Sequence, residues 1–309
     1  LNCLDLVREY DDDVLLITGP ALGPEGDLLS QGRAGELPVQ VLPSLRRDIH
    51  PKWDWLASRA IRNALAEFGP DVVHTHSAKG GLLGRHAAWK QNIPAVVHTI
   101  HGAPFHPYQS RLARDFFCRC ERWASARCHR LISVADAMTD LMVESGVAPR
   151  EKFITIYSGM DVEPFTRAHE HRERTRQKYG FSSEHVVIGK IARLFHLKGH
   201  QDLITAAIPV VQRQPNVRFL LIGDGILRET LTQRIAELGL SEHFVFAGLV
   251  PPSDVPALIG GMDALVHASY REGLARALPQ ALIAGVPVVS YDVDGAREVA
   301  ITGQTGILV

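Results

Sequence analysis

Short runs of β-branched and other apolar residues alternate with amphipathic stretches along almost the whole chain. The runs are continuously apolar, which is typical of strands buried on both faces of a parallel sheet. They predict strands at 14–19, 39–44, 71–77, 95–102, 130–136, 153–159, 186–192, 218–225, 243–250, 263–269 and 286–292. Helices are predicted between most of these strands, including 53–68, 80–91, 110–128 and 136–145.

The alternation lapses at residues 162–184, a polar and charged stretch that begins near Pro164 and passes Gly180. We interpret it as a linker or surface segment at a boundary between domains 1–163 and 164–309. Each part repeats the strand–helix pattern, so the sequence predicts an α/β protein of two doubly wound, Rossmann-like domains that face each other. Ligands of such sheets bind at the carboxyl ends of the strands, which directs attention to the residues found there.

Composition narrows the classes of protein to consider. The 309 residues suggest about two domains, and 46% hydrophobic with 22% charged residues is typical of a soluble globular protein. The net charge of −1 gives no field to recruit nucleic acid. No apolar run reaches the roughly 18 residues of a membrane span, and no signal-peptide pattern is present. Four cysteines in a chain this long do not form a disulfide framework, so a reducing cytoplasm is expected.

Both ends of the chain look truncated. It begins at Leu1 without an initiator Met, and it ends at Val309 in a strand-like run. We therefore expect segments of the protein to lie beyond both ends of this sequence.

Two cations follow the predicted strand at 186–192. Arg193 and Lys198 are five residues apart, on a loop that enters a helix near Gly199. A helix N-terminus offers unpaired N–H groups and the positive end of the dipole, and the fork of Arg and the point charge of Lys add to them. This combination suits a diphosphate, although a solvated basic loop explains the same residues about as well.

Two further strand ends carry glycines. Gly223 and Gly225 allow a sharp turn or close approach of a ligand to the backbone, and a base could lie against the main chain before Val250. Each signal is weak by itself, because connections between strands and helices often need glycine.

Glu272 follows the predicted strand at 263–268 and is expected in the first turn of a helix. A carboxylate there stabilises the helix dipole by a few tenths of a kcal/mol, which explains the residue without a ligand. Gln280 lies eight positions later, about 12 Å along a helix axis. That separation roughly matches the distance from the sugar ring to the ribose of a nucleotide sugar, with Gly273 and the next N–H groups beside the diphosphate.

The second half of the chain resembles the nucleotide-binding half of the retaining GT-B glycosyltransferases of family 4. The resemblance lies in the order and spacing of Arg193, Lys198, the GDG at 223–225, the run at 246–250 and Glu272. The amino-terminal half is similar to the same family, so the resemblance covers nearly the whole chain. It implies the GT-B architecture, with two facing Rossmann-like domains and a cleft between them. The first would be the acceptor domain, lacking its first strand, and the second the nucleotide-sugar donor domain, lacking its C-terminal helices.

The resemblance also implies roles for residues. Arg193 and Lys198 would hold the donor diphosphate, and Glu272 would lie beside the donor sugar as the first Glu of the family's E-x7-E motif. His101, at the end of strand 95–100, would be the active-site His near the sugar. Gln280 stands where the second Glu usually binds ribose, and it keeps an acceptor oxygen without the charge. The remaining expected donor-binding residues are Gly223, Gly225, Val250, Gly273, Leu274 and Ala275.

The implied reaction transfers a sugar from a nucleotide-sugar donor to a hydroxyl of a saccharide or lipid-linked acceptor, with retention of anomeric configuration. The acceptor would attack the face that the diphosphate leaves, through an oxocarbenium-like state, while Arg193 and Lys198 offset the leaving-group charge. A preorganised group of this kind is typically worth roughly 3 kcal/mol of barrier. No metal or other cofactor is expected, and the metal-like DVD at 292–294 is interpreted as a turn.

Other interpretations of the residues stay open at this point. A sugar-nucleotide epimerase of the same architecture, or a degenerate, non-catalytic sugar-binding protein, would share these features, and Gln280 favours the latter. His74, His76, His98 and His101 lack nearby carboxylates or cysteines that would complete a zinc site.

Segment 111–130 holds six Arg and two acids, with Phe116, Phe117 and Trp123 between them. A basic amphipathic helix of this kind can lie on an anionic membrane, which would place the protein at the inner membrane face. An ordinary solvated helix face is the simpler explanation.

Overall fold

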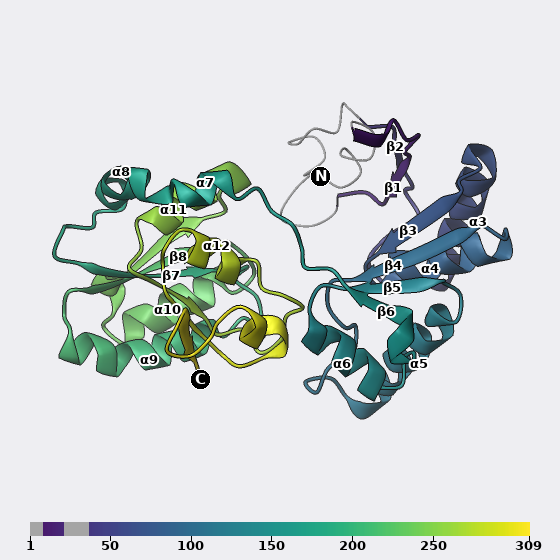
Figure 1. Cartoon of the computed structure of the whole chain (residues 1–309). Helices are drawn as coiled ribbons and strands as arrows, with labels where there is room; N and C mark the ends of the chain where they lie inside the picture. The colour runs from purple at the N-terminus through teal and green to yellow at the C-terminus, as the bar shows by residue number, and fades with distance from the viewer. Residues whose placement is uncertain (1–8, 22–36) are drawn as a thin grey trace. The chain divides into compact units, whose positions relative to one another are not determined.

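The computed structural model describes residues 9–21 and 37–309, so residues 1–8 and 22–36 of the predicted first domain lie outside the described residues. By the contacts among its residues the chain divides into two compact units. The first comprises Leu1–Val134 and Met138–Ile156, and the second Ala135–Ala137 and Tyr157–Val309. Each unit has its own parallel sheet with helices packed on it (Figure 1).

The first unit is built on a parallel sheet whose strands lie in chain order, β3-β4-β5-β6. Parallel neighbours need a crossover between them, and the helices of this unit supply it. The sheet contains β3 (Val72–His76), β4 (Ala95–Ile100), β5 (Arg130–Ser133) and β6 (Phe153–Thr155). The helices are α3 (Pro51–Phe68), α4 (Ala78–Lys90), α5 (Arg111–Ser125) and α6 (Asp136–Glu144). A separate parallel pair joins β1 (Leu16–Thr18) to β2 (Val39–Val41).

The second unit contains a six-stranded parallel sheet in the order β12-β11-β10-β7-β8-β9. Its strands are β7 (Val186–Ile191), β8 (Val217–Ile222), β9 (Phe244–Gly248), β10 (Ala264–His267), β11 (Val288–Ser290) and β12 (Gly306–Leu308). Its helices are α7 (Glu163–Thr166), α8 (Arg172–Lys178), α9 (His200–Arg213), α10 (Arg228–Glu237), α11 (Val255–Gly260) and α12 (Ala277–Ile283). The strands predicted in both halves of the sequence are thus confirmed, with shorter bounds.

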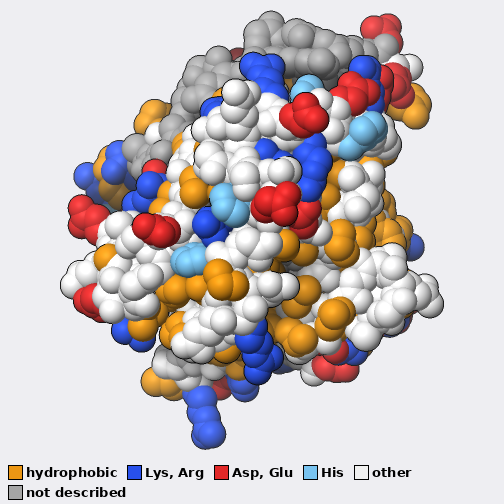
Figure 2. All heavy atoms as spheres, turned by 90° about the vertical axis from the view of Figure 1, so that its left-hand side faces the viewer, with side chains coloured by type: hydrophobic (Ala, Val, Ile, Leu, Met, Phe, Trp, Pro, Cys, Tyr) orange, Lys and Arg blue, Asp and Glu red, His pale blue; other side chains and the backbone are white. Residues whose placement is uncertain are grey.

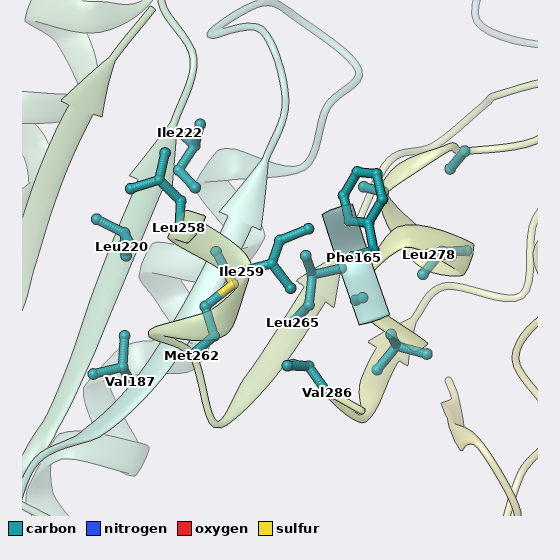
Figure 3. Close-up of a cluster of buried hydrophobic side chains, with 14 of the residues drawn as sticks. Phe165, Val187, Leu220, Ile222, Leu258, Ile259, Met262, Leu265, Leu278 and Val286 are labelled. Atoms are coloured by element: carbon teal, nitrogen blue, oxygen red, sulfur yellow. The ribbon is translucent and has the colours of Figure 1, made fainter. Parts of the chain in front are cut away.

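Helices cover both faces of the second sheet, and a separate core fills each side. Leu203 of α9 and Leu231 of α10 pack on one face, in a cluster with Phe219 of β8. Figure 3 shows the core on the other face, where Ile259 of α11 and Leu278 of α12 lie with strand residues. Full burial of one such side chain stabilises the fold by about 1.5–3 kcal/mol. The layered α/β architecture predicted from the continuous apolar runs is confirmed.

The order of strands in the second sheet reverses between β7 and β10. From β7 the chain proceeds outward through β8 and β9, and then returns to place β10 on the opposite side of β7. The chain that leaves β7 leads to α9 on one face of the sheet, and the chain that leaves β10 leads to α12 on the other. Ligands of α/β sheets bind at such a reversal of strand order. The residues that follow these two strands are Arg193–Lys198 and Glu272.

The predicted start of the last helix was wrong. Glu272 was expected in its first turn, but α12 begins at Ala277 and Glu272 lies in the preceding loop. The reason is Pro279, whose ring has no N–H and clashes with the carbonyl four residues earlier unless it lies in the first turn. Neither the helix-dipole explanation of Glu272 nor the 12 Å helical spacing to Gln280 therefore applies.

The interpretation of 162–184 as a linker was also wrong in part, because this segment contains α7, α8 and a 3-10 turn between them, Ala168–His171. Phe165 is buried in the core that α11 and α12 share. Arg172 and Arg176 pair with Asp263 at 2.5 and 3.2 Å, just before β10. The charges that made the segment look like a linker hold it against the second unit.

On the face of the molecule seen in Figure 2, acidic and basic side chains are interspersed, in keeping with the net charge of −1. Across residues 9–21 and 37–309, none of the helices combines the length and apolar character needed to cross a membrane.

Candidate functional site

The loop after β7 presents Lys198 from a constrained backbone. Leu197 has φ 64°, a left-handed conformation that is costly for a side chain of this size. Gly199 follows with φ 64° as the N-cap of α9, and a Cβ at this position would lie 1.7 Å from the carbonyl oxygen of Ala268. The Leu197 carbonyl accepts a hydrogen bond from the N–H of Tyr270, at 2.9 Å, in the loop after β10. The two strand-end loops are therefore locked together beside Lys198.

Lys198 and Glu272 form an ion pair across these loops, with 2.5 Å between Nζ and Oε1. Their side chains are 21% and 23% exposed, so the pair is largely shielded from water. Burial alone would raise the pKa of Glu272, but the charge and hydrogen bond of Lys198 outweigh it and hold that pKa below its ordinary value. A carboxylate and an ammonium separated by 74 positions in sequence thus meet at the reversal of strand order.

Asp294 fixes the backbone of Glu272. Its Oδ2 accepts a hydrogen bond from the Glu272 N–H at 2.6 Å. Asp294 itself has φ 46°, in the left-handed region that Asp tolerates better than most residues. Burial raises the pKa of Asp294, against the opposing effect of this hydrogen bond. The sequence alone suggested only a turn at 292–294, and the second acid of that turn positions the site.

Arg193 leaves the end of β7 beside the same loop. Its guanidinium lies 5.0 Å from the centre of the Phe195 ring, within the range of a cation–π contact. Its carbonyl oxygen lies 3.0 Å from Nε2 of His200, in the first turn of α9. The Arg193 backbone therefore contacts the first turn of α9, and Lys198 directly precedes its N-cap Gly199, so the loop enters a helix where the sequence predicted.

The predicted glycine positions have a structural basis. Gly223 has φ 129°, and a Cβ there would lie 2.2 Å from the carbonyl oxygen of Ala192. The GDG turn therefore packs backbone to backbone against the loop that carries Arg193. Val250 is partly buried against the hydrophobic core.

The segment after Glu272 contributes mainly backbone. Gly273 is buried, and its carbonyl accepts a hydrogen bond from the Gly295 N–H at 3.2 Å. Leu274 is half-buried and the side chain of Ala275 lies in the core at 8% exposure. Gln280 is half-buried on α12. The roles of these residues toward a donor stay predictions.

Asp202, which the sequence did not single out, ties three segments together. Its Oδ2 accepts hydrogen bonds from the hydroxyls of Tyr270, at 2.6 Å, and Tyr291, at 2.7 Å. The two rings stack with their centres 5.9 Å apart. The hydrogen bond to Asp202 raises the pKa of Tyr291 to about 12. One carboxylate on α9 therefore holds the loops that follow β10 and β11.

His101 belongs to the first unit, at the end of β4, where histidines of two strands gather. Its Nε2 lies 3.0 Å from Nδ1 of His76, so one ring donates and the other accepts. Nε2 of His74 lies 2.7 Å from Oγ1 of Thr99, within hydrogen-bond distance. Burial lowers the pKa of His101, and burial, followed by the neighbouring His74 and His101, lowers that of His76 to about 4. The assignment of His101 to the donor sugar stays a prediction.

In the part of the chain that the structure describes, no group of three or more His, Cys, Asp or Glu side chains is arranged to hold a metal ion. Asp292, the first acid of the DVD turn, pairs instead with Arg297 at 2.9 Å.

Sequence reasoning also missed Lys190. It lies on β7 with 1% of its surface exposed, inside a run that was counted only as an apolar strand. A cation within a continuous run of buried-strand residues is itself a signal, because Lys is rarely buried without a partner.

Two family descriptions match the chain. Residues 3–159 match the Glycosyl transferase 4-like domain, and residues 171–309 match Glycosyl transferases group 1.

Curated relatives support the same assignment. The chain is 30% identical over 221 residues to 2-deoxystreptamine glucosyltransferase of Streptomyces kanamyceticus, covering 69% of this chain and 57% of that protein. It is 26% identical over 257 residues to UDP-Gal:alpha-D-GlcNAc-diphosphoundecaprenol alpha-1,3-galactosyltransferase of Escherichia coli, covering 82% of this chain and 66% of that protein. The chain thus spans less than two thirds of the length of these two relatives.

A solved structure, that of HepE of Anabaena in complex with UDP, is 25% identical to this chain with a TM-score of 0.78. The similarity covers 99% of this chain and 80% of HepE. With a parallel α/β sheet in each unit and both family descriptions matched in order, the chain belongs to the glycosyl transferase 4-like, group 1 family of GT-B glycosyltransferases.

Proposed function

We propose that the protein transfers a sugar from a nucleotide-sugar donor to an acceptor hydroxyl with retention of anomeric configuration. The observation that carries the proposal is the Lys198–Glu272 pair at the carboxyl ends of β7 and β10, where the strand order reverses. Family membership supports transfer over epimerisation, and both relatives described above are named as glycosyltransferases. The complex of HepE with UDP supports a nucleoside diphosphate as the group bound here.

In the proposed reaction the bond between the anomeric carbon and the diphosphate oxygen breaks, and the acceptor oxygen bonds to the same face of the sugar. The proton of the acceptor hydroxyl passes to the departing phosphate oxygen. Arg193 and Lys198, in the loop that enters α9, would offset the negative charge that grows on the diphosphate. Fixed cations of this kind need no reorganisation at the moment of reaction, which is the source of their catalytic effect.

Glu272 has two tasks in this proposal. It pairs with Lys198 at 2.5 Å, which keeps the ammonium in place. With a donor bound it would lie beside the sugar, while Asp294 keeps its backbone fixed through the 2.6 Å hydrogen bond. Gln280 would contact the ribose through its amide, and no metal or other cofactor is required.

Product analysis tests this function. The protein is incubated with UDP-glucose, GDP-glucose or ADP-glucose, with and without a mixture of saccharide and lipid-linked acceptors. We expect a new glycoside only when an acceptor is present, and nucleoside diphosphate in equal amount. A sugar nucleotide altered at one carbon without acceptor would indicate an epimerase, and binding with no product would indicate a non-catalytic protein.

The same donors test the site. Arg193→Ala and Lys198→Ala should each weaken binding of the sugar nucleotide at least tenfold, because each removes a full charge from the diphosphate. Lys178→Ala, at an exposed position of α8 in the same unit, is the matched control and should bind normally. Unchanged affinity in both site variants would contradict the assignment.

We also propose that α5 contacts an anionic membrane surface, which would place the protein at the inner membrane face and bring it to a lipid-linked acceptor. Leu112, Phe116 and Trp123 recur at helical spacing on one exposed face of α5, at 85%, 53% and 40% exposure. The acceptor in the name of the Escherichia coli relative is linked to diphosphoundecaprenol, in keeping with such a location.

The charges of α5 favour the same surface. Of its two acids, Glu121 is buried and paired with Arg85 at 2.9 Å, which leaves Asp115 exposed. Arg114 and Arg119 are also exposed, and the 3.6-residue period places Arg119 at the edge of the apolar face. The solvent side of the helix is therefore more basic than its sequence suggests. Basic residues beside an apolar stripe are the pattern by which helices lie on anionic lipid.

A further inference from the structure

Lys190 is a buried cation in the second sheet. It lies on β7, opposite Leu221 of β8, with 1% of its surface exposed. Its Nζ has no hydrogen-bond partner among the residues that the structure describes. A buried ammonium without a partner costs several kcal/mol, and Met or Leu would fill the same volume without that cost. Packing alone does not account for a lysine at this position.

Charged and titratable groups of the donor site surround this lysine. They come from the loop after β7, the loop after β10, the first turn of α9 and the end of β10, and they are Lys198, Glu272, Asp202, His200 and His267. Burial, and then the charge of Lys198, lowers the pKa of Lys190 to about 7, against the opposing carboxylates. Near neutral pH the lysine therefore changes its charge with small changes in the local field.

A donor bound at Lys198 would change that field. In the structure Glu272 is balanced by Lys198, with 2.5 Å between Nζ and Oε1. A diphosphate at Lys198 competes for the same ammonium and adds its own negative charge. The other charged neighbours of Glu272 are Arg271, beside it in the chain, and the carboxylate of Asp294. A further counter-charge from the interior of the unit must therefore come from a group that takes up a proton.

Two buried bases can provide that counter-charge by taking up a proton. His267 Nε2 lies 3.6 Å from Oε1 of Glu272, and Lys190 is the other base. Burial lowers the pKa of His267 to about 4, so this ring would need a large shift to charge at neutral pH. Lys190 needs only a small one. The lysine is therefore the base that responds.

We propose that Lys190 is a positioning residue of the donor site, which takes up one proton from solvent as the diphosphate binds and balances Glu272 while Lys198 contacts the phosphate. This inference rests on the proposed function, since it requires a diphosphate at Lys198. The lone pair of the neutral amine accepts the proton, and no covalent bond to the donor forms. Because a proton is captured with the ligand, donor affinity falls as pH rises above neutral.

Calorimetric titration tests the proposal through the number of protons bound. UDP-glucose, GDP-glucose and ADP-glucose are titrated into the protein in pairs of buffers that differ in ionisation enthalpy. A sugar nucleotide, unlike free UDP, has no phosphate proton to exchange near neutral pH, so protons taken up belong to the protein. We expect uptake that approaches one proton per ligand near pH 8 and falls toward zero near pH 6, where Lys190 is already charged.

Variants assign the uptake to the lysine. Lys190→Met should abolish the uptake and weaken binding, and Lys190→Arg should bind with no uptake because its charge is permanent. Lys178→Met, at an exposed position, should behave as the unaltered protein. Uptake that survives in Lys190→Met would overturn the proposal, and so would uptake that is lost in His267→Asn but retained in Lys190→Met.

The pH profile of the unaltered protein decides the question even if neither Lys190 variant folds. Uptake that increases from pH 6 to pH 8 supports the lysine, and uptake confined to more acidic pH contradicts it in favour of histidine. Binding of a sugar nucleotide without proton uptake near pH 8 would contradict the role of Lys190 but would not affect the proposed function. Failure of all three sugar nucleotides to bind overturns the proposed function, and the inference with it.

Discussion

Nζ of Lys198 and Oε1 of Glu272 are 2.5 Å apart, although the residues leave different strands of the sheet. The cation predicted to hold the diphosphate and the carboxylate predicted to lie beside the sugar are thus each other's partners in the structure. Lys198 stabilises the charged form of Glu272 in a place that is largely shielded from water. Removal of one therefore changes the chemistry of its partner as well as the contact itself.

Loss of Lys198 should cost stability that a second substitution restores. In Lys198→Met the buried Glu272 carboxylate loses its cation, and we expect the free energy of unfolding to fall by about 1.5–3 kcal/mol. Lys198→Met/Glu272→Gln should recover most of the loss, since neither charge of the pair remains. Urea unfolding of both variants and of Glu272→Gln measures the coupling. Additive effects would show that the pair contributes little.

The stability of Lys198→Met should also depend on pH differently from that of the unaltered protein. In the unaltered protein the pKa of Glu272 is lowered, so its contribution to stability is present at neutral pH and is lost as pH falls through the folded pKa. Without Lys198, burial raises that pKa, so the destabilisation of Lys198→Met should be largest at neutral pH and shrink toward pH 5. A difference that stays constant with pH would contradict this account.

Lys190 should destabilise the protein at neutral pH, independently of any ligand. Its pKa is about 7 when folded and 10.5 in its ordinary state, so the unfolded chain binds more protons between these values. Stability should therefore rise with pH from about 7 to about 10, by up to about 1.4 kcal/mol per pH unit. Lys190→Met should flatten this rise. Denaturant unfolding at a series of pH values compares the two proteins, with Lys178→Met as control.

Substitution of Asp202 should cost the protein the stability of two hydrogen bonds. Asp202→Asn weakens the acceptor of both tyrosine hydroxyls, and hydrogen bonds to charged groups contribute about 1.5–3 kcal/mol each. The pKa of Tyr291 should fall from about 12 toward its ordinary value, which absorbance titration detects. Tyr291→Phe removes one of the two bonds and serves as the matched comparison. An unmoved tyrosine titration in Asp202→Asn would exclude the interaction in solution.

The apolar face of α5 should decide membrane binding. Leu112→Ser/Phe116→Ser should reduce co-sedimentation with vesicles containing phosphatidylglycerol, because two exposed anchors of the proposed face are lost. Ile49→Ser, at a similarly exposed apolar position of the first unit, is the control. Equal binding of all three proteins would refute the proposed contact. A change in oligomeric state in place of vesicle binding would assign the face to a protein partner.

Gln280→Glu should preserve or tighten binding of the sugar nucleotide, as a carboxylate accepts stronger hydrogen bonds from ribose hydroxyls than an amide does. Titration of the variant with UDP-glucose, GDP-glucose and ADP-glucose measures the effect. A large loss of affinity would mean that Gln280 contributes a donor N–H that Glu does not have.

The strands and the layered fold could be predicted from the sequence, since both-face burial leaves a continuous apolar run in each strand, as in Val186–Ile191. The position of Arg193, Lys198 and Glu272 beyond the carboxyl ends of strands could also be predicted, because each lies in the segment after a predicted strand. The start of α12 was misjudged, although Pro279 marks it. The apolar spacing around it was given more weight than the missing N–H of proline.

Other features depend on contacts between distant residues and leave no local pattern. Three such features arise where the loops after different strands contact one another. They are the ion pair of Lys198 with Glu272, the hydrogen bond from the Glu272 N–H to Asp294, and the left-handed backbone of Leu197. Lys190 left a signal, a charge inside an apolar run, but its neighbours are known only from the sheet order. Sequence patterns therefore find the edge of the sheet where a site lies, and tertiary contacts determine how it is charged.

The two hydrogen bonds to Asp202 have a consequence for anyone who alters donor preference. The loop that carries Glu272 and the loop after β11 are fastened to the same oxygen of one helix residue, through Tyr270 and Tyr291. Replacing either loop by one without a tyrosine at this position would leave Asp202 with one hydroxyl fewer and the two loops no longer joined through it. A redesign of donor preference should therefore replace three segments together, the start of α9 and both loops.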